Sequence, residues 1–303
     1  MSRREISFYS EGAKLHGDLF LPDGAGADDR RAGIVLCHGY TGVKDLFLPD
    51  NAEWLRRDGY AVLTFDYKGW GDSEGARNRL APFSRVADCF AALSFLAAQE
   101  AVDGERLGLY GTSYGGATAI WAAALDARVG CVVSTVGVGH GERWMRSVRR
   151  PDEWFDLLAR AAADRTKRAL HGESEIVERD EILLQDRASA ELSAAARRAN
   201  PAAIDSLPLE FVDETLSFHA DWVVGKIAPR PLLLITTDGD RLVPPQESEN
   251  LFARAGEPKK LVTLKGYGHY DVYSEPAFSA VMSETGAWFG AHLPARKNHG
   301  QIG

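Results

Sequence analysis

The chain has 303 residues, of which 45% are hydrophobic and 26% are charged. These proportions are close to the average of folded soluble proteins, so they exclude a largely disordered chain. The formal net charge of −8 argues against a protein that binds nucleic acid or an anionic membrane, since both need a basic surface. The length suits one large α/β domain or two smaller ones.

Three cysteines, Cys37, Cys89 and Cys131, are too few and too odd in number for a disulfide framework. The N-terminal segment MSRREISFYSEG lacks the apolar stretch of a signal peptide. No apolar run approaches the roughly 18 to 20 residues of a membrane-spanning helix. We therefore expect a soluble cytoplasmic protein without a nucleic-acid or membrane partner.

The first half of the chain alternates strand patterns with helix patterns. An antiparallel hairpin is expected from 6–10 and 14–21, which flank a Glu-Gly-Ala turn. Apolar runs predict buried strands at 33–39, 60–66, 106–113 and 130–136. Helical spacing predicts helices at 47–58, at 84–98 with Ser84 as N-cap, and at 115–125. This order predicts a mostly parallel sheet with helices on both faces.

The alternation stops after the sixth strand. Residues 141–225 are rich in Ala, Arg, Glu and Asp, with helical spacing and no convincing strand. Strands resume at 230–237 and 260–266, with helices near 245–255 and 276–291. We therefore predict a core of residues 1–137 and 226–294, a helical cap at 138–225, and a flexible tail at 295–303.

The sharpest chemical signal is GTSYGG at 111–116, where a buried strand meets a helix. This is the setting of a G-x-S-x-G nucleophile elbow, a strained turn whose glycines avoid crowding of the backbone. The start of the following helix also favours developing negative charge. Ser113 is therefore the candidate nucleophile.

A serine nucleophile needs a base, and the base needs an orienting acid. His269 lies in the glycine-rich loop GYGHY just beyond the last strand, at the sheet edge where such sites gather. Asp240 follows the strand LLLITT and precedes His269 in the chain. Asp238 is an alternative acid and His38 a weaker alternative base. The order Ser113, Asp240, His269 is the chain order of the α/β-hydrolase triad.

Nearly the whole chain resembles an α/β hydrolase. The motifs CHGYTG, FDYKGWGDSEG, GTSYGG, DGDRLVPP and GYGH resemble the bacterial dienelactone-hydrolase-like and acetyl-esterase-like group. The run 66–75 with GTSYGG is also similar to the X-prolyl dipeptidyl peptidase and cocaine-esterase family. The resemblance implies an oxyanion hole formed by the backbone N–H groups of Tyr40 and Tyr114.

Weaker signals lie in and near the cap. The aromatic residues Trp144, Trp154, Phe218 and Trp222 are candidates for lining an acyl or aryl pocket, although helix packing explains most of them better. The arginines at 143, 146, 149 and 150 could bind a carboxylate, but a solvated helix face explains them better. Glu74 is a minor candidate for an accessory role.

These observations predict a serine hydrolase that cleaves a carboxylic ester, or a related acyl bond, of a small molecule through an acyl-enzyme on Ser113. An amidase or peptidase, a carbon–carbon bond hydrolase, an acyltransferase and a non-catalytic binding module are the alternatives. No motif for a metal or a nucleotide cofactor occurs, because GVGHG lacks the third glycine of a dinucleotide loop. The composition is compatible with a homodimer.

Overall fold

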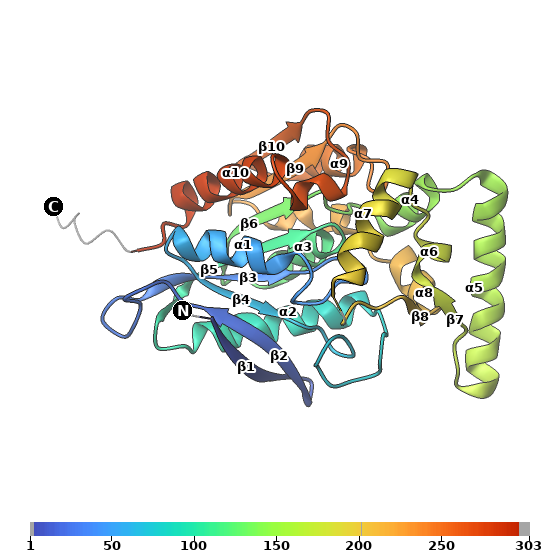
Figure 1. The fold of residues 1–303 in the computed structure, drawn as a ribbon, viewed down its shortest axis with the longest axis horizontal. Coiled ribbons are helices and arrows are strands. Elements are labelled where there is room, and N and C mark those ends of the chain that lie inside the picture. Colours follow the sequence, from blue (N-terminus) through green and yellow to red (C-terminus); the bar gives the residue numbers. More distant parts are fainter. Residues whose placement is uncertain (1–2, 201, 297–303) are drawn as a thin grey trace.

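The computed structural model describes residues 3–200 and 202–296, and its centre is an eight-stranded sheet of order β1-β2-β4-β3-β5-β6-β9-β10 (Figure 1). The strands are β1 (Arg3–Ser10), β2 (Ala13–Phe20), β3 (Arg31–Cys37), β4 (Ala61–Phe65), β5 (Val102–Thr112), β6 (Val129–Thr135), β9 (Leu232–Thr237) and β10 (Lys259–Leu264). The pairs β1–β2 and β2–β4 are antiparallel, and all other neighbours are parallel. The predicted α/β class with a mostly parallel sheet is confirmed.

Helices cover both faces of the sheet. On one face, α1 (Leu48–Arg57) and α10 (Ala277–His292) pack with β-strand residues such as Ile34 and Leu233 in one apolar cluster. On the other face, α2 (Pro82–Ala97), α3 (Tyr114–Leu125) and α9 (Gln246–Arg254) contribute to a second, larger cluster. Burial on both faces explains why the central strands are apolar runs rather than alternating patterns.

One predicted helix start is wrong. Helix α2 begins at Pro82 with Ala81 as its N-cap, not at Ser84. Proline suits the first turn of a helix, because its φ is already helical and its missing N–H would have no partner there. Ser84 therefore lies inside the first turn.

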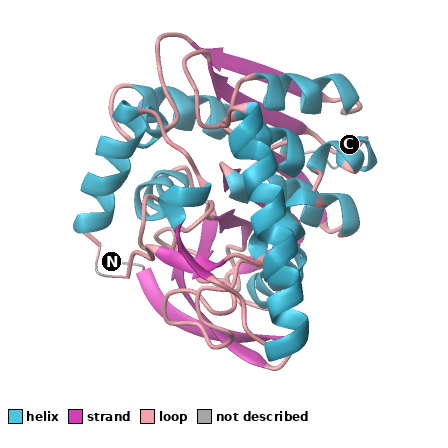
Figure 2. Ribbon diagram, turned by 90° about the vertical axis from the view of Figure 1, so that its right-hand side faces the viewer, coloured by secondary structure: helices cyan, strands magenta, loops and turns pink. Residues whose placement is uncertain are grey.

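The segment between β6 and β9 is mainly helical and stands at one end of the sheet. It contains α4 (Gly141–Ser147), α5 (Pro151–His171), α6 (Arg179–Ile182), α7 (Arg187–Arg198), α8 (Phe211–Leu216) and the short 3₁₀ turns η1 (Ala220–Trp222) and η2 (Val224–Lys226). Figure 2 shows α5 as the long helix in the foreground. No helix of the described residues, α5 included, is long and apolar enough to cross a membrane.

The expectation that this segment holds no strand is wrong. β7 (Ile176–Glu178) and β8 (Ser206–Pro208) form a small antiparallel sheet. Each strand has three residues, which is too short for a period-of-two pattern to stand out from the helical sequence around it.

The predicted tail lies mostly outside the described residues. Residues 297–303 are in that part. Ala295 is described, and its carbonyl accepts a hydrogen bond from the N–H of Ala32 at 3.0 Å.

Candidate active site

Ser113 stands at the sharp turn between β5 and α3. Its backbone has φ 55° and ψ −123°, and residues other than glycine rarely adopt a positive φ. The turn is also crowded: a Cβ on Gly111 would lie 2.2 Å from the carbonyl oxygen of Gly115, and a Cβ on Gly115 would lie 2.1 Å from that of Cys37. Only glycine fits at either position, as the elbow motif requires.

Three side chains from different strand ends form one hydrogen-bonded chain. The Ser113 hydroxyl lies 3.0 Å from Nε2 of His269, and Nδ1 of His269 lies 2.7 Å from Oδ2 of Asp240. The other oxygen of Asp240 accepts hydrogen bonds from the N–H groups of Leu242 (2.9 Å) and Val243 (2.7 Å). The carboxylate therefore orients His269 so that Nδ1 carries the proton and Nε2 is free to accept one from Ser113.

The two alternatives weighed from the sequence lie outside this chain. The Asp238 carboxylate accepts a hydrogen bond from the Gly266 N–H, and its side chain is 39% exposed. His38 is buried, with Nδ1 3.2 Å from the Gly39 carbonyl. Burial and the nearby Arg85 guanidinium lower the pKa of His38 well below its usual value, so it stays neutral.

The backbone after β3 forms a loop, residues 38–41, that we call the oxyanion loop. It passes close to the nucleophile, since a Cβ on Gly39 would lie 3.3 Å from Cβ of Ser113. Tyr40 follows Gly39 in this loop. Tyr114 is the first residue of α3, and such an N–H has no partner within its own helix. Tyr114 thus directly follows Ser113 at the turn, and Tyr40 lies in the neighbouring loop that passes close to it.

A buried arginine on α2 supports the oxyanion loop. Arg85 donates hydrogen bonds to the carbonyl oxygens of Gly39 (3.0 Å) and Tyr40 (3.4 Å). Its guanidinium carbon lies 4.6 Å from the ring centre of Tyr67 and 4.8 Å from that of Trp70. Sequence reasoning missed this residue, although a charged residue on the buried stripe of a helix is a recognisable signal.

Comparison with known proteins agrees with this geometry. The family model described as "Serine aminopeptidase, S33" matches residues 28–276. The chain belongs to this family. It is an α/β hydrolase, so the superfamily predicted from the motifs is confirmed, whereas the finer resemblance to the dienelactone-hydrolase-like group stays a prediction.

Individual relatives match along most of this hydrolase. An uncharacterized 31.7 kDa protein of Escherichia coli is 31% identical over 86% of this chain and 91% of its own. A thiohydrolase, aneE, of Aspergillus aculeatus is 28% identical over 92% of this chain and 90% of its own. The solved structure of the α/β hydrolase GrgF from Penicillium has a TM-score of 0.82, with 25% identity over 97% of this chain and 99% of its own.

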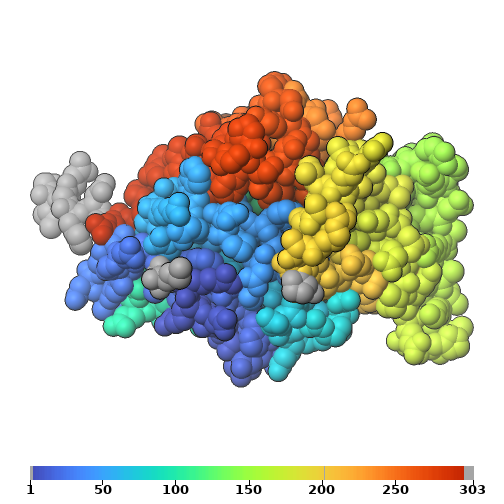
Figure 3. Space-filling model, in the orientation of Figure 1, coloured from blue at the N-terminus to red at the C-terminus, as the bar shows by residue number. Residues whose placement is uncertain are grey.

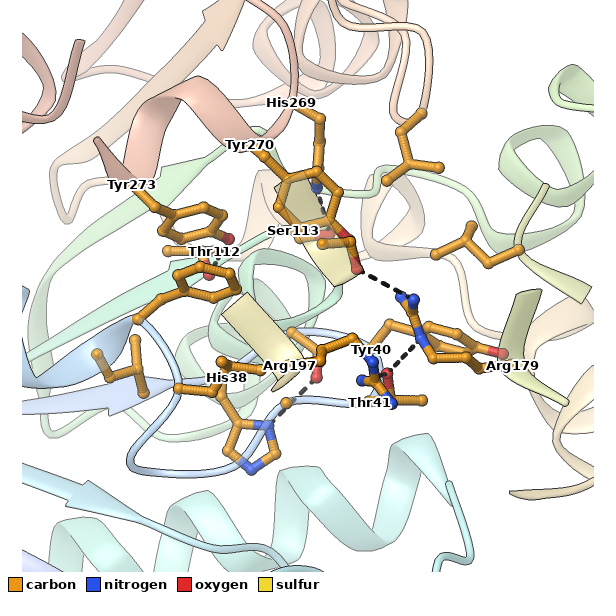
Figure 4. Close-up of a pocket in the computed structure, with 18 residues that line it drawn as sticks. His38, Tyr40, Thr41, Thr112, Ser113, Arg179, Arg197, His269, Tyr270 and Tyr273 are labelled. Carbon is orange, nitrogen blue, oxygen red and sulfur yellow. Dashed lines mark hydrogen bonds between the residues drawn. The ribbon is translucent and has the colours of Figure 1, made fainter. Parts of the chain in front are cut away.

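A cavity of the hydrolase opens onto Ser113 and His269 (Figure 4). The core contributes the oxyanion loop and the aromatic residues Tyr270 and Tyr273 of η3 (Tyr270–Tyr273). The mainly helical segment between β6 and β9, which we call the cap, contributes Arg179, Leu183, Ser193 and Arg197. In Figure 3 the yellow surface of α7 lies against the blue N-terminal part and the red C-terminal part of the core, so its residues can reach a cavity between them. Sequence reasoning missed these cap residues.

The aromatic residues predicted to line this cavity do not line it. Trp144 and Phe218 are buried against the ring of Tyr114, at centroid distances of 5.8 and 5.7 Å. Trp154 lines a separate groove, and Trp222 is 64% exposed. The prediction that these four line the cavity at Ser113 is corrected: Trp144 and Phe218 pack on Tyr114 of the elbow helix α3 instead.

The arginines at 143–150 form a solvated face only in part. Arg143 forms an ion pair with the buried Glu247 (2.6 Å), which joins the cap to α9, and another with the buried Asp221 (3.3 Å), whereas Arg149 donates to the carbonyl oxygens of Met145 and Ile182. Arg150 lies 3.1 Å from Glu153. None of these arginines lines the cavity at Ser113.

The motif FDYKGWGDSEG forms a turn beside the core rather than part of the cavity. Asp66 accepts a hydrogen bond from the Lys44 N–H at 2.7 Å, and its burial raises its pKa to about 6. Glu74 accepts a hydrogen bond from the Lys14 N–H at 2.8 Å. Glu74 is therefore bonded to β2 and does not line the cavity at Ser113.

Proposed function

We propose that this hydrolase cleaves a carboxylic ester or thioester of a small molecule through an acyl-enzyme on Ser113. One observation carries the proposal: the hydrogen bonds that connect Ser113 to His269 and His269 to Asp240. This is the arrangement of nucleophile, base and orienting acid that acyl transfer by serine requires.

In the first half of the reaction, Oγ of Ser113 attacks the carbonyl carbon while Nε2 of His269 takes its proton. The imidazolium that forms is stabilised by Asp240, which stays ionised. The carbonyl oxygen becomes negative and is held by the backbone N–H groups of Tyr40 and Tyr114, each worth roughly 3 kcal/mol of barrier. His269 then protonates the leaving group, and the acyl-enzyme remains.

In the second half, a water molecule takes the place of the leaving group. His269 removes its proton, the hydroxide attacks the acyl carbon, and Ser113 leaves with the proton returned from Nε2. Both halves use Ser113 as nucleophile or leaving group and His269 as base and acid, with Asp240 and the two backbone N–H groups in supporting roles.

Oxygen esters and thioesters are favoured over amides for three reasons. An alkoxide or thiolate leaves more readily than an amine, and a relative carries the name thiohydrolase. An aminopeptidase would also need an acid to bind the ammonium group of its substrate. Among the described residues that line the cavity there is no Asp or Glu, and two are arginines.

The test is the hydrolysis of p-nitrophenyl acetate and of S-phenyl thioacetate by wild type and by Ser113→Ala. We expect turnover that falls by a factor on the order of 10³ or more in Ser113→Ala. The matched control is Ser279→Ala, a hydroxyl on α10 bonded to Glu275, which should retain wild-type rates. Activity of Ser113→Ala within about tenfold of wild type, or no turnover of either compound by folded wild type, would contradict the proposal.

A further inference from the structure

Two cap arginines face the cavity at Ser113 from the side of the oxyanion loop (Figure 4). Arg179 is the first residue of α6, and Arg197 lies in the last turn of α7. Their side chains are only 5% and 7% exposed. Burying a guanidinium is costly unless its donors find acceptors, so the partners of each donor matter.

One nitrogen of the Arg179 guanidinium has no hydrogen-bond partner among the described residues. Its Nε donates to Oγ1 of Thr41 at 2.8 Å, and its Nη1 donates to Asp180 (2.7 Å) and Ser193 (3.2 Å). Its Nη2, which carries two N–H groups, has no hydrogen-bond partner among the described residues. Nη2 is also not fully enclosed by other protein atoms, so a ligand can reach it.

Arg197 adds a second cation beside it. Its Nη1 donates to the same Thr41 oxygen at 3.3 Å, and its Nε donates to Asp205 at 3.0 Å. The acids that pair with the two arginines, Asp180 and Asp205, have side chains that are 64% and 73% exposed. Water screens these outer carboxylates, whereas the buried guanidiniums are screened much less, so the cavity is electropositive.

We propose that Arg179, supported by Arg197, binds a carboxylate of the substrate, so that this hydrolase acts on esters or thioesters that carry a free carboxyl group. The fork of a guanidinium matches a carboxylate in shape and charge. The unpaired Nη2 of Arg179 is the atom that donates hydrogen bonds to this carboxylate. The inference rests on the proposed acyl hydrolysis at Ser113.

The experiment compares pairs of esters in which a carboxylate is exchanged for an uncharged group. On the acyl side, the pair is mono-p-nitrophenyl adipate and p-nitrophenyl hexanoate. On the leaving-group side, the pair is 4-acetoxybenzoate and its methyl ester. The measured quantity is the ratio of kcat/KM for the anionic ester to that for the neutral ester within each pair, because this ratio cancels general effects on the triad.

In wild type we expect a preference for the anionic ester in at least one pair, which identifies the side that bears the carboxylate. Arg179→Gln should lower that ratio by about tenfold to a hundredfold, the range for one charge-assisted hydrogen bond. Arg179→Lys, which keeps the charge, should restore part of it. The matched control is Arg187→Gln on α7, where the side chain is 93% exposed and pairs with Glu191.

A binding measurement separates this inference from the proposed function. Monoethyl adipate should raise the Tm of Ser113→Ala, and the rise should vanish in Ser113→Ala/Arg179→Gln. Equal ratios in wild type and Arg179→Gln, or a Tm rise that is absent or independent of Arg179, would overturn the inference. The two arginines would then serve only to attach the cap to the core through their hydrogen bonds to Thr41. If wild type hydrolyses none of the esters but the Tm rise of Ser113→Ala still depends on Arg179, the proposed function is overturned and the carboxylate site stands.

Discussion

The substitution Asp240→Asn exposes how the triad sets the protonation of its base. One oxygen of Asp240 accepts two backbone N–H groups, from Leu242 and Val243, and the other accepts from Nδ1 of His269 at 2.7 Å. An amide has one oxygen and one NH₂ group. Because the two backbone donors need an acceptor, the amide oxygen turns toward them and the NH₂ group faces His269.

An NH₂ group donates, so Nδ1 of His269 must then act as acceptor and its proton moves to Nε2. A protonated Nε2 cannot take the proton of Ser113, which lies 3.0 Å away. In a serine protease the equivalent change lowers kcat about 10⁴-fold, which corresponds to about 5 kcal/mol of barrier. We expect a loss of similar size here.

The assay is kcat for p-nitrophenyl hexanoate, with thermal unfolding as the check that the variant folds. Asp238→Asn is the matched control, since this carboxylate is 39% exposed and bonds only to the Gly266 N–H and, more distantly, to Lys265. It should change kcat by less than about threefold. A loss of less than about tenfold in Asp240→Asn, or a larger loss in Asp238→Asn, would refute the reasoning.

Three further predictions concern the elbow, the oxyanion loop and a buried acid. Gly115→Ala should lower the free energy of unfolding in urea by more than about 2 kcal/mol, because the added Cβ would lie 2.1 Å from the Cys37 carbonyl oxygen. The control Gly290→Ala, in α10 with nothing within 4 Å, should be neutral or stabilising; equal effects would contradict the steric argument. Arg85→Gln should lower kcat about tenfold with KM little changed, since two carbonyls of the oxyanion loop lose their donor; an unchanged kcat with a lower Tm would make Arg85 merely structural. Burial raises the pKa of Asp66 from the ordinary 3.8 to about 6, so the folded state binds the proton more tightly than the unfolded state. As the pH rises from about 4 to about 6, wild type should therefore lose stability relative to Asp66→Asn, by about 1.4 kcal/mol per pH unit. Parallel curves of unfolding free energy against pH would rule this out.

The central sheet and the candidate triad were predictable because their signals are local. Apolar runs bounded by glycine mark strands that are buried on both faces, whatever lies further along the chain. The elbow at Ser113 needs a strand, two glycines and a helix within a few residues. Asp240 and His269 each follow a strand, and parallel strands bring their carboxyl ends to one edge of the sheet.

Arg85 was not predictable from the same kind of signal. It lies on the buried side of α2, where a charge is normally excluded. What makes it tolerable is a set of partners from distant segments: the rings of Tyr67 and Trp70 and the carbonyls of the oxyanion loop. A sequence does not show which aromatic rings and carbonyls will converge on one guanidinium.

The sequence alone thus determined the α/β-hydrolase class and the candidate triad, whereas the lining of the cavity at Ser113 was decided only by tertiary structure. The cap sequence contains both aromatic and arginine residues at helical spacing, and periodicity does not say which face of a helix meets the core. Packing placed Trp144 and Phe218 against Tyr114, and placed Arg179 and Arg197 in the lining of the cavity at Ser113. The reason is physical: a side chain's surroundings depend on elements far away in the chain, which only the folded arrangement brings together.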